Sequence, residues 1–266
     1  MLIDAFTFFN EYDMLEARLK YYYDFVDKFV ISECDHTHAG NYKGFNFEKE
    51  MKRYEKYLPK IEYLKLTIDP TQYDFTKPKS TNYSAGNWIL EKEQRNYISK
   101  GLTNFEDFVM ISDVDEVCTI DSIKDAISNY KDEMIAIGSG QEMFWYSFQT
   151  KEPNLWSGSV LTKVKYALQY SPEFFREKRW VLPKMLRGYH MTYFMDVEKM
   201  KYKIENFAHQ ELNQEDFTDV ERIKSRIANK IEPFQRPNVP LVDVKPENID
   251  LEIYHIFNNC SKILSN

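Results

Sequence analysis

The stretch from Phe105 to Val117 constrains the fold of this chain more than any other, because an apolar run ends there on closely spaced acids. Residues Phe108 to Ile111 predict a short buried strand. Three carboxylates follow within four positions, at Asp113, Asp115 and Glu116. Alternate residues of an extended chain point to the same side, so we expect Asp113 and Asp115 to share one cation.

Carboxylates this close repel one another unless a cation or a proton compensates them. Oxygen ligands suit a hard divalent ion such as Mg²⁺ or Mn²⁺, which keeps positions open for substrate phosphates. The carboxyl end of a central strand is also where open α/β sheets bind ligands. The triplet therefore predicts chemistry on a phosphorylated substrate. The competing interpretation is a solvated turn that caps the next helix.

Composition excludes several classes of protein. At 266 residues the chain can bury a substantial core. Its net charge of −7 argues against nucleic acid as the main partner, because binding a nucleic-acid backbone needs a basic surface. The cysteines, Cys34, Cys118 and Cys260, form no Cys-x-x-Cys pair, which favours free thiols over zinc or disulfides.

The N-terminus shows neither the basic segment nor the cleavage site of a secretory signal. No apolar run approaches the roughly 18–20 residues that span a bilayer. We therefore expect a cytoplasmic protein with at most peripheral membrane contact.

The first half of the chain alternates strand-like and helix-like segments. We expect strands over 2–9, 28–32, 61–66 and 108–111, and helices over 12–24, 48–57 and 84–101. Ser84 is a candidate N-cap, and a long loop over 69–83 precedes it. Strands separated by helices imply right-handed crossovers, so the sequence predicts an α/β fold with a mostly parallel central sheet flanked by helices.

The pattern loosens after residue 120. We expect a strand or hairpin over 134–149, a strand over 185–194, and helices over 122–130, 197–204 and 216–231. The charged segment over 172–179 is interpreted as irregular. Four prolines follow residue 232, so we predict one domain over residues 1–232 and a C-terminal extension over 233–266 that packs on it.

Polar side chains also follow the first two predicted strands. Asn10 and Glu11 follow the first strand and Glu33 the second, at the same sheet edge as Asp113. A carboxylate or amide there can accept hydrogen bonds from ribose hydroxyls or a uracil N–H. For Asn10 the alternative is a helix N-cap, whereas Glu33 is harder to explain structurally.

Three other candidates have strong structural alternatives. The loop over 35–43 contains two histidines and is interpreted as a substrate-contacting loop or a solvated one. Arg95 follows Glu91 by four residues, so it either reaches a pyrophosphate or pairs with Glu91 on the surface. His190 lies in an apolar strand, where it is either a ligand or a hydrogen-bonded core residue.

Several motifs occur in a recognisable order between about residue 2 and residue 210. They are Phe8-Phe9-Asn10-Glu11, Leu15-Glu16-Ala17-Arg18-Leu19, residues 26–33, Thr37 with Gly40, Arg95, residues 111–116, Trp156-Ser157-Gly158 and Gly188-Tyr189-His190. This ordered set resembles glycosyltransferase family 17, the family of the N-acetylglucosaminyltransferases that add the bisecting residue to N-glycans. Tyr189 departs from the family's Gly-Trp-His.

The resemblance implies a GT-A fold and an inverting, metal-dependent transfer from a UDP-sugar, UDP-GlcNAc in characterised relatives. Asp113 and Asp115 would hold Mn²⁺ or Mg²⁺, and His190 would complete the metal shell or contact phosphate. Arg95 would assist the diphosphate. Asn10, Glu11, Glu33 and Thr37 would bind the rest of the donor. Because the membrane anchor of the animal members is missing here, we expect a bacterial or viral surface glycan as acceptor.

An inverting displacement also needs a carboxylate base near the acceptor hydroxyl. The candidates are Glu116, Glu142, Glu205 and Glu211. We favour Glu116 because of its place beside the metal residues.

Two other functions compete with glycosyl transfer. Residues 113–117 also fit the Asp-x-Asp-x-Val motif of haloacid-dehalogenase-type phosphatases. Those enzymes place the motif on their first strand, and no Gly-Asp-x-x-x-Asp element follows it here. The other competitor is a non-catalytic module that binds a sugar or a nucleotide, against which the intact acidic triplet argues.

Overall fold

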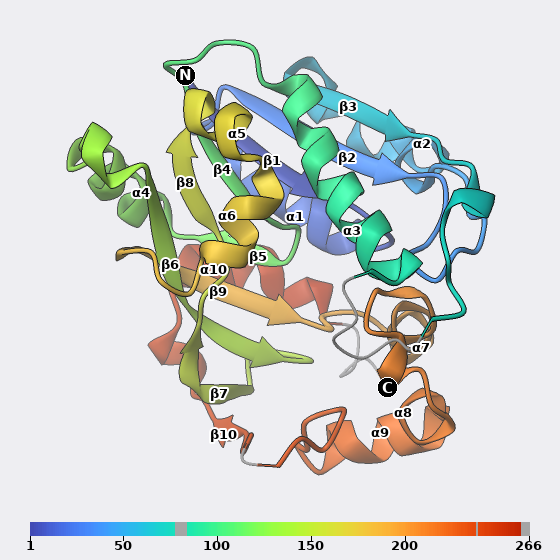
Figure 1. The fold of residues 1–266 in the computed structure, drawn as a ribbon. Coiled ribbons are helices and arrows are strands. Elements are labelled where there is room, and N and C mark those ends of the chain that lie inside the picture. The colour runs from blue at the N-terminus through green and yellow to red at the C-terminus, as the bar shows by residue number, and fades with distance from the viewer. Residues whose placement is uncertain (78–83, 238, 262–266) are drawn as a thin grey trace.

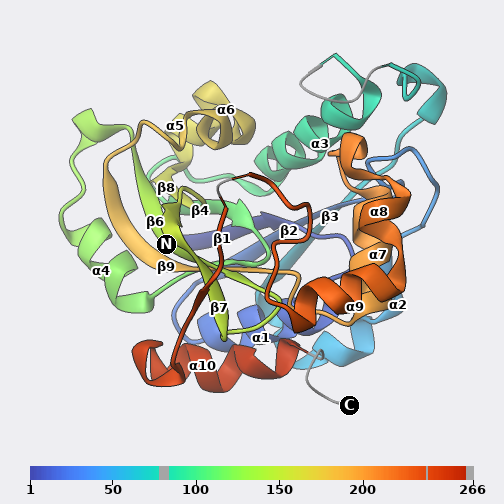
Figure 2. The same cartoon turned by 90° about the horizontal axis from the view of Figure 1, so that it is seen from below.

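A computed structural model of the chain describes residues 1–77, 84–237 and 239–261. Within these residues the strands form one ten-stranded sheet, with helices on both faces (Figures 1 and 2). The strands are β1 (Leu2–Thr7), β2 (Lys28–Cys34), β3 (Ile61–Leu66), β4 (Phe108–Asp113), β5 (Glu116–Cys118), β6 (Ala136–Trp145), β7 (Thr150–Trp156), β8 (Val160–Lys163), β9 (Lys184–Thr192) and β10 (Val242–Asp243). The helices are α1 (Tyr12–Tyr22), α2 (Asn46–Lys49), α3 (Gly86–Tyr97), α4 (Ile120–Ser128), α5 (Val164–Tyr170), α6 (Pro172–Lys178), α7 (Val197–Asn206), α8 (Glu215–Thr218), α9 (Val220–Ala228) and α10 (Leu251–Phe257).

The sheet is mixed, which corrects the prediction of a mostly parallel one. Its order is β10-β7-β6-β8-β4-β1-β2-β3, and β9 pairs with β6 and β5. Strands β4, β1, β2 and β3 are parallel, whereas β8 runs antiparallel to β4 and to β6. A parallel pair needs a crossover connection of a dozen or more residues. The loops on either side of β7 have only a few residues, and β7 therefore pairs antiparallel with β6.

Residues of β1 alternate between two hydrophobic layers. Leu2 and Phe6 belong to the layer that α1 and α10 cover. Ile3 and Ala5 belong to the layer on the opposite face, beneath α5 and α6 (Figure 2). Strand β1 is therefore buried on both sides, as a central strand of a parallel sheet must be.

Most predicted elements are present, and four local predictions are wrong. The helix expected over 48–57 is the short α2 followed by a 3₁₀ helix, Met51–Lys60, which continues past Pro59. Residues Pro172–Lys178 form a helix rather than an irregular segment, with Ser171 accepting a hydrogen bond from the Phe174 N–H. The helix expected over 216–231 is broken in two at Asp219, which caps α9. Ala85, not Ser84, occupies the N-cap of α3. Residues 78–83 of the predicted loop lie outside the described residues.

The chain after residue 232 packs on the rest of the fold. Strand β10 pairs with β7, and α10 lies against α1 (Figure 1). Ile253 and Phe257 are fully buried in the same hydrophobic cluster as the α1 side chains. The ring centres of Phe257 and Tyr21 lie 5.9 Å apart. The C-terminal segment therefore supplies part of the main core.

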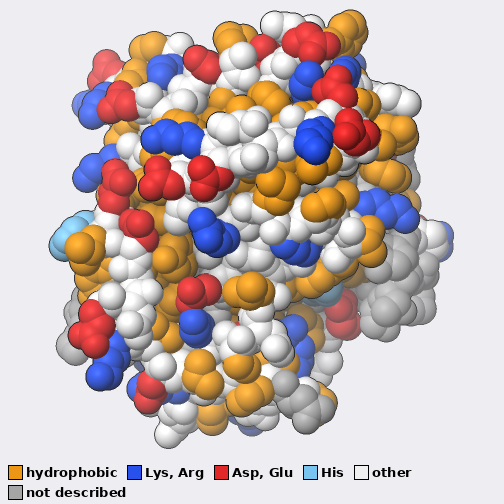
Figure 3. All heavy atoms as spheres, turned by 90° about the vertical axis from the view of Figure 1, so that its left-hand side faces the viewer, with side chains coloured by type: hydrophobic (Ala, Val, Ile, Leu, Met, Phe, Trp, Pro, Cys, Tyr) orange, Lys and Arg blue, Asp and Glu red, His pale blue; other side chains and the backbone are white. Residues whose placement is uncertain are grey.

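The surface shows mixed charge. On the face in Figure 3, acidic and basic side chains are interspersed, and no large patch of one sign is visible. No helix within the described parts of the chain is long and apolar enough to cross a membrane.

The burial of α10 predicts that the C-terminal segment stabilises the whole fold. Phe257→Ala removes a fully buried ring, so we expect a loss of about 3–5 kcal/mol in the free energy of unfolding. Leu251→Ala, at a side chain that is 68% exposed on the same helix, should change it by no more than about 0.5 kcal/mol. Urea unfolding followed by circular dichroism measures both. Equal midpoints for Phe257→Ala and the unmutated protein would contradict a stabilising role.

Candidate functional site

A cavity of about 980 Å³ lies at the carboxyl ends of β1, β2 and β4. This volume is within the range of ligand sites in proteins. Its walls come from the ends of these strands, the loop after β2, helices α3, α6 and α7, strand β9 and the segment after α7. The edge of the sheet that the sequence predicts as the binding edge therefore carries the cavity.

Residues 113–116 form an acidic turn beside this cavity. Arg18, a fully buried residue of α1, holds this turn in place. Its guanidinium donates to both carboxylate oxygens of Asp4, at 2.8 and 2.6 Å, and to Ser112 Oγ at 2.7 Å. It also donates to the carbonyl oxygens of Asp113, Val114 and Glu116, at 3.1, 3.2 and 2.7 Å. One side chain therefore fixes the backbone of residues 112–116.

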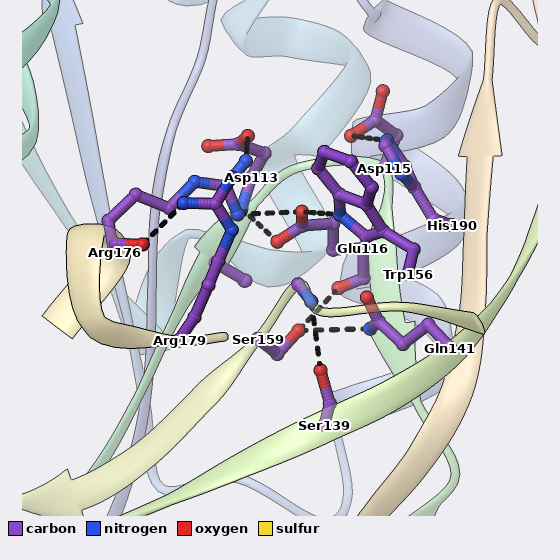
Figure 4. A network of polar contacts seen from close by, with 12 residues as sticks. Asp113, Asp115, Glu116, Ser139, Gln141, Trp156, Ser159, Arg176, Arg179 and His190 are labelled. Atoms are coloured by element: carbon purple, nitrogen blue, oxygen red, sulfur yellow. Dashed lines mark hydrogen bonds and ion pairs between the residues drawn. The ribbon is translucent and has the colours of Figure 1, made fainter. Parts of the chain in front are cut away.

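Asp113 and Asp115 do not share a face of an extended strand, contrary to the prediction. Strand β4 ends at Asp113, residues 114–115 form a turn, and β5 starts at Glu116. Asp113 pairs with Arg176 at 2.5 Å and Arg95 at 3.3 Å. Asp115 lies apart from this group (Figure 4), 3.4 Å from Lys203 and 3.5 Å from His190.

Both aspartates are ionised at neutral pH. Burial alone would raise the pKa of Asp113, but Arg176 and Arg95 outweigh it and lower the pKa to about 2. Burial likewise opposes ionisation of Asp115, and the charges of Lys203 and His190 hold its pKa well below the usual value. The turn is thus a pair of carboxylates compensated by the protein's own cations.

Glu116 is fully buried and has no free acceptor position toward the cavity. One carboxylate oxygen accepts from Trp156 Nε1 at 2.8 Å and from Arg176 at 2.7 Å, and the other accepts from the Asp113 N–H at 3.1 Å (Figure 4). It does not line the cavity. These contacts do not support the prediction that Glu116 is the base.

The other candidate bases differ in their surroundings. Glu142 pairs with Lys151, Glu205 lies 3.7 Å from Lys201, and neither lines the cavity. Glu211 does line it. One of its carboxylate oxygens accepts from His209 at 2.7 Å, and the other is buried without a partner among the described residues.

Three arginines lie along one wall of the cavity. Arg95 is paired with Glu91 at 2.9 Å, with Glu173 and with Asp113, so the predicted Glu91 pair exists, with Arg95 buried and Glu91 partly exposed. The other two, Arg176 and Arg179, belong to or follow α6 (Figure 4). Neither arginine was predicted as a site residue, although a serine and a proline before a run of charged residues are start signals of a helix.

Comparison with known proteins decides the family. The sequence pattern of glycosyltransferase family 17 matches residues 1–236. The chain belongs to glycosyltransferase family 17. It is therefore a transferase of glycosyl groups, with a donor and an acceptor as substrates, and the phosphatase alternative falls. No curated protein matches the chain.

Two solved structures are similar to parts of the chain. Mannose-6-phosphate isomerase from Helicobacter pylori has a TM-score of 0.36 and 10% identity, covering 64% of this chain and 73% of the other. Mouse xyloside xylosyltransferase 1 in its apo form has a TM-score of 0.29 and 10% identity, covering 70% and 77%. At such TM-scores neither carries an argument about this family 17 protein.

Two glycines of the family 17 motifs lie directly against β5. A Cβ atom on Gly158 would lie 2.0 Å from Gln141 Oε1 and 2.8 Å from the carboxyl group of Glu116. One on Gly188 would lie 2.1 Å from the carbonyl oxygen of Val117. Both positions require glycine because the neighbouring chain leaves no room for a side chain. These motifs therefore pack closely against β5, the strand that follows the acidic turn.

The residues predicted to bind the donor are not all at the cavity. Glu11 and Thr37 line it, and Glu11 pairs with Lys203 at 2.9 Å. Asn10 lines a smaller neighbouring cavity, and its Oδ1 has no partner among the described residues. It does not cap α1, because Glu11 occupies the N-cap.

Glu33 has a structural role instead. Its carboxylate accepts from the N–H groups of Asn46 and Phe47 at the start of α2, at 2.6 and 3.0 Å. It also accepts from Tyr63 Oη at 2.8 Å and pairs with Lys43. Because the side chain is fully buried and saturated, it cannot contact a nucleoside.

The residues predicted to hold a metal do not form a metal site as they lie. Within the described parts of the chain, no group of three or more His, Cys, Asp and Glu side chains could hold a metal ion. Burial opposes protonation of His190, but the charge of Asp115 outweighs it and raises the pKa of His190. Metal binding therefore stays a prediction.

The contacts of Arg18 predict a strong coupling with Asp4. Arg18→Met leaves the buried Asp4 carboxylate without a cation, so we expect a loss of about 3–5 kcal/mol in unfolding free energy. The double variant Asp4→Leu/Arg18→Met removes both charges and should lose much less than the sum of the single changes. Urea unfolding of all three variants measures the coupling, with the exposed Arg187→Met as control. Additive losses would contradict it.

Proposed function

We propose that this protein transfers a sugar from a UDP-sugar to a glycan acceptor with inversion of configuration, and that the sugar is GlcNAc. It would thus act like the β-1,4-mannosyl-glycoprotein 4-β-N-acetylglucosaminyltransferases, and on a GT-A fold. Family membership supports transfer of a glycosyl group. The observation that carries the rest is the cavity at the acidic turn, whose lining includes the cationic side chains of Arg95, Arg176, Arg179 and Lys203.

The cations supply what the departing nucleotide requires. Cleavage of the bond between sugar and phosphate leaves negative charge on the diphosphate, and fixed cations in a partly buried site stabilise that charge. The cavity is also lined by Trp88, Trp145, Trp156 and Trp180. Aromatic faces pack well on the apolar C–H faces of a sugar ring. The lining therefore offers surfaces for both parts of a nucleotide sugar.

We propose Glu211, rather than Glu116, as the base that takes the proton of the acceptor hydroxyl. Every other carboxylate that lines the cavity in the described residues contacts a lysine or arginine: Glu11, Glu91, Asp113, Asp115, Glu173 and Glu177. Within the described parts of the chain, the Glu211 carboxylate contacts only His209 and keeps one oxygen without a partner. A carboxylate free to accept a proton is what the inverting step needs.

A divalent ion, Mn²⁺ or Mg²⁺, is a separate proposal: it joins the site only together with the donor. In the free protein Arg176 and Lys203 hold the two aspartates, whereas a bound diphosphate would attract the same cations. Asp113 and Asp115 would then be its ligands, since carboxylate oxygens suit hard cations. When bound, it would neutralise charge on the departing UDP. The cytoplasmic location also stays a prediction.

A thermal-shift panel tests the donor and the metal. We expect UDP and UDP-GlcNAc to stabilise the protein, by about 2.7 kcal/mol at a hundredfold excess over Kd, and UDP-Gal, UDP-Glc and GDP-Man to do so less. Mn²⁺ should raise the melting temperature with UDP but not alone. Asp115→Asn should lose the effect of Mn²⁺, and Asp121→Asn, at an exposed carboxylate of α4, should keep it.

Each result of this panel has a separate meaning. The absence of a shift with any nucleotide contradicts the UDP-sugar donor. An equal shift with Mn²⁺ alone contradicts the joint entry of metal and donor. A shift with UDP-GlcNAc, combined with no transfer to any glycan in a separate turnover assay, would favour the non-catalytic module.

The choice of base predicts different effects of two substitutions. Glu211→Gln should lower kcat by about 10²–10⁴-fold and leave donor affinity and melting temperature unchanged. Glu116→Gln should instead lower the melting temperature, because it weakens the buried contact with Arg176. Glu205→Gln, just outside the cavity, is the matched control. Loss of turnover at normal stability in Glu116→Gln, with near-normal turnover in Glu211→Gln, would restore Glu116.

A further inference from the structure

Arg179 is the exception among the cations of the cavity wall. Arg95, Arg176 and Lys203 each have carboxylate partners. In residues 1–77, 84–237 and 239–261, by contrast, no carboxylate lies within 4 Å of the Arg179 guanidinium, which donates instead to the carbonyl oxygen of Arg176. Its Nε is buried and has no partner within those residues. Arg179 therefore brings a positive charge that the protein does not compensate by direct pairing.

The surroundings of Arg179 make this charge costly in the free protein. Removing a cation from water without pairing it is unfavourable. Burial and the nearby charge of Arg176 lower the pKa of Arg179 to about 10, which still leaves the side chain charged at neutral pH. An anionic ligand at this position would supply the negative charge that direct pairing does not.

Two aromatic rings hold the guanidinium in place. It lies 4.7 Å from the centre of the Trp180 ring and 5.4 Å from that of Trp156. Contacts between a guanidinium and aromatic faces are attractive and restrict the motion of the side chain. Trp156 also donates to Glu116, which ties Arg179 to the acidic turn. The cation is thus oriented before any ligand arrives.

We propose that Arg179, together with Arg176, forms the binding site for the diphosphate of the donor. Both side chains line the cavity, and Figure 4 shows them next to each other beside Asp113. The forked donors of a guanidinium match two oxygens of a phosphate group. Arg95, the arginine predicted for this role from sequence, already contacts three carboxylates. The assignment rests on the proposed function for the identity of the anion.

Calorimetric titrations of the full chain with pyrophosphate, UDP and uridine test this assignment. Arg179→Gln should weaken binding of pyrophosphate and of UDP by about tenfold or more and leave uridine unchanged, because one charge-assisted contact is lost. Arg187→Gln makes the same change at an exposed position of β9 outside the cavity and should change nothing. The melting temperature of Arg179→Gln should not fall, since the variant removes an uncompensated charge. A merely structural arginine would lower it.

The outcomes separate this assignment from the proposed donor. Unchanged pyrophosphate and UDP affinities in Arg179→Gln overturn the assignment and leave the UDP-sugar proposal intact. Pyrophosphate binding that depends on Arg179, with no uridine binding and no gain for UDP over pyrophosphate, supports an anion site and overturns the UDP donor. Failure of both anions to bind the unmutated protein overturns both.

A second variant covers the case in which Arg179→Gln does not fold. Arg179→Lys keeps the charge and the long apolar stem but loses the forked donors. It should bind pyrophosphate more weakly than the unmutated protein does. Equal affinity in a folded Arg179→Lys contradicts two-oxygen recognition by Arg179.

Discussion

The buried contact between Arg18 and Asp4 is the interaction on which the site depends. A guanidinium removed from water must satisfy its donors, and Arg18 does so with one carboxylate, one hydroxyl and three carbonyl oxygens. Those carbonyls belong to the turn after β4, so the conformation that satisfies Arg18 is also the one that presents Asp113 and Asp115 to the cavity. A buried ion pair adds little net stability, but it strongly disfavours any arrangement that leaves one partner alone. The pair therefore favours this conformation of the turn over alternatives that would leave Arg18 or Asp4 unpaired.

The same rule of charge compensation extends outward from the turn. Asp113, Asp115 and Glu116 are each held by cations from α3, α6 or α7 or by an indole N–H, and the free site is thereby balanced. Among the residues that the structure describes, two groups of the cavity lack this balance: Arg179 pairs with no carboxylate, and Glu211 contacts only His209. A ligand gains most where the protein has left a charge uncompensated. A cation binds the phosphorylated part of a donor, and a carboxylate accepts the proton of a hydroxyl group. Arg179 therefore suits the donor diphosphate, and Glu211 suits the acceptor hydroxyl.

The strands of the parallel half of the sheet could be predicted from the sequence, whereas the strand pairing of the other half could not. Strand β1 is buried on both faces, so its apolar run is visible without any knowledge of neighbours. The second half depends on which strand each hairpin meets, and that pairing is a long-range contact with no local signal. Helix α6 was missed because its sequence, Pro-Glu-Phe-Phe-Arg-Glu-Lys, has only two apolar residues in a row, of which Phe175 alone is fully buried. The cationic wall was missed with it.

The errors at the site have one physical origin, which is that a local pattern specifies residue types but not their partners. Glu33 lies at a strand end, where the sequence does not distinguish a ligand contact from a hydrogen bond to the next helix. In the structure its carboxylate accepts from N–H groups at the start of α2. Proximity to the acidic turn favoured Glu116, yet its carboxylate is buried there, binds Trp156 and Arg176, and does not line the cavity. Glu211 has no strand or motif to mark it, and its backbone lies in a short 3₁₀ turn after α7. A base must line the cavity and keep an oxygen without a partner, and these two properties arise only when distant segments meet.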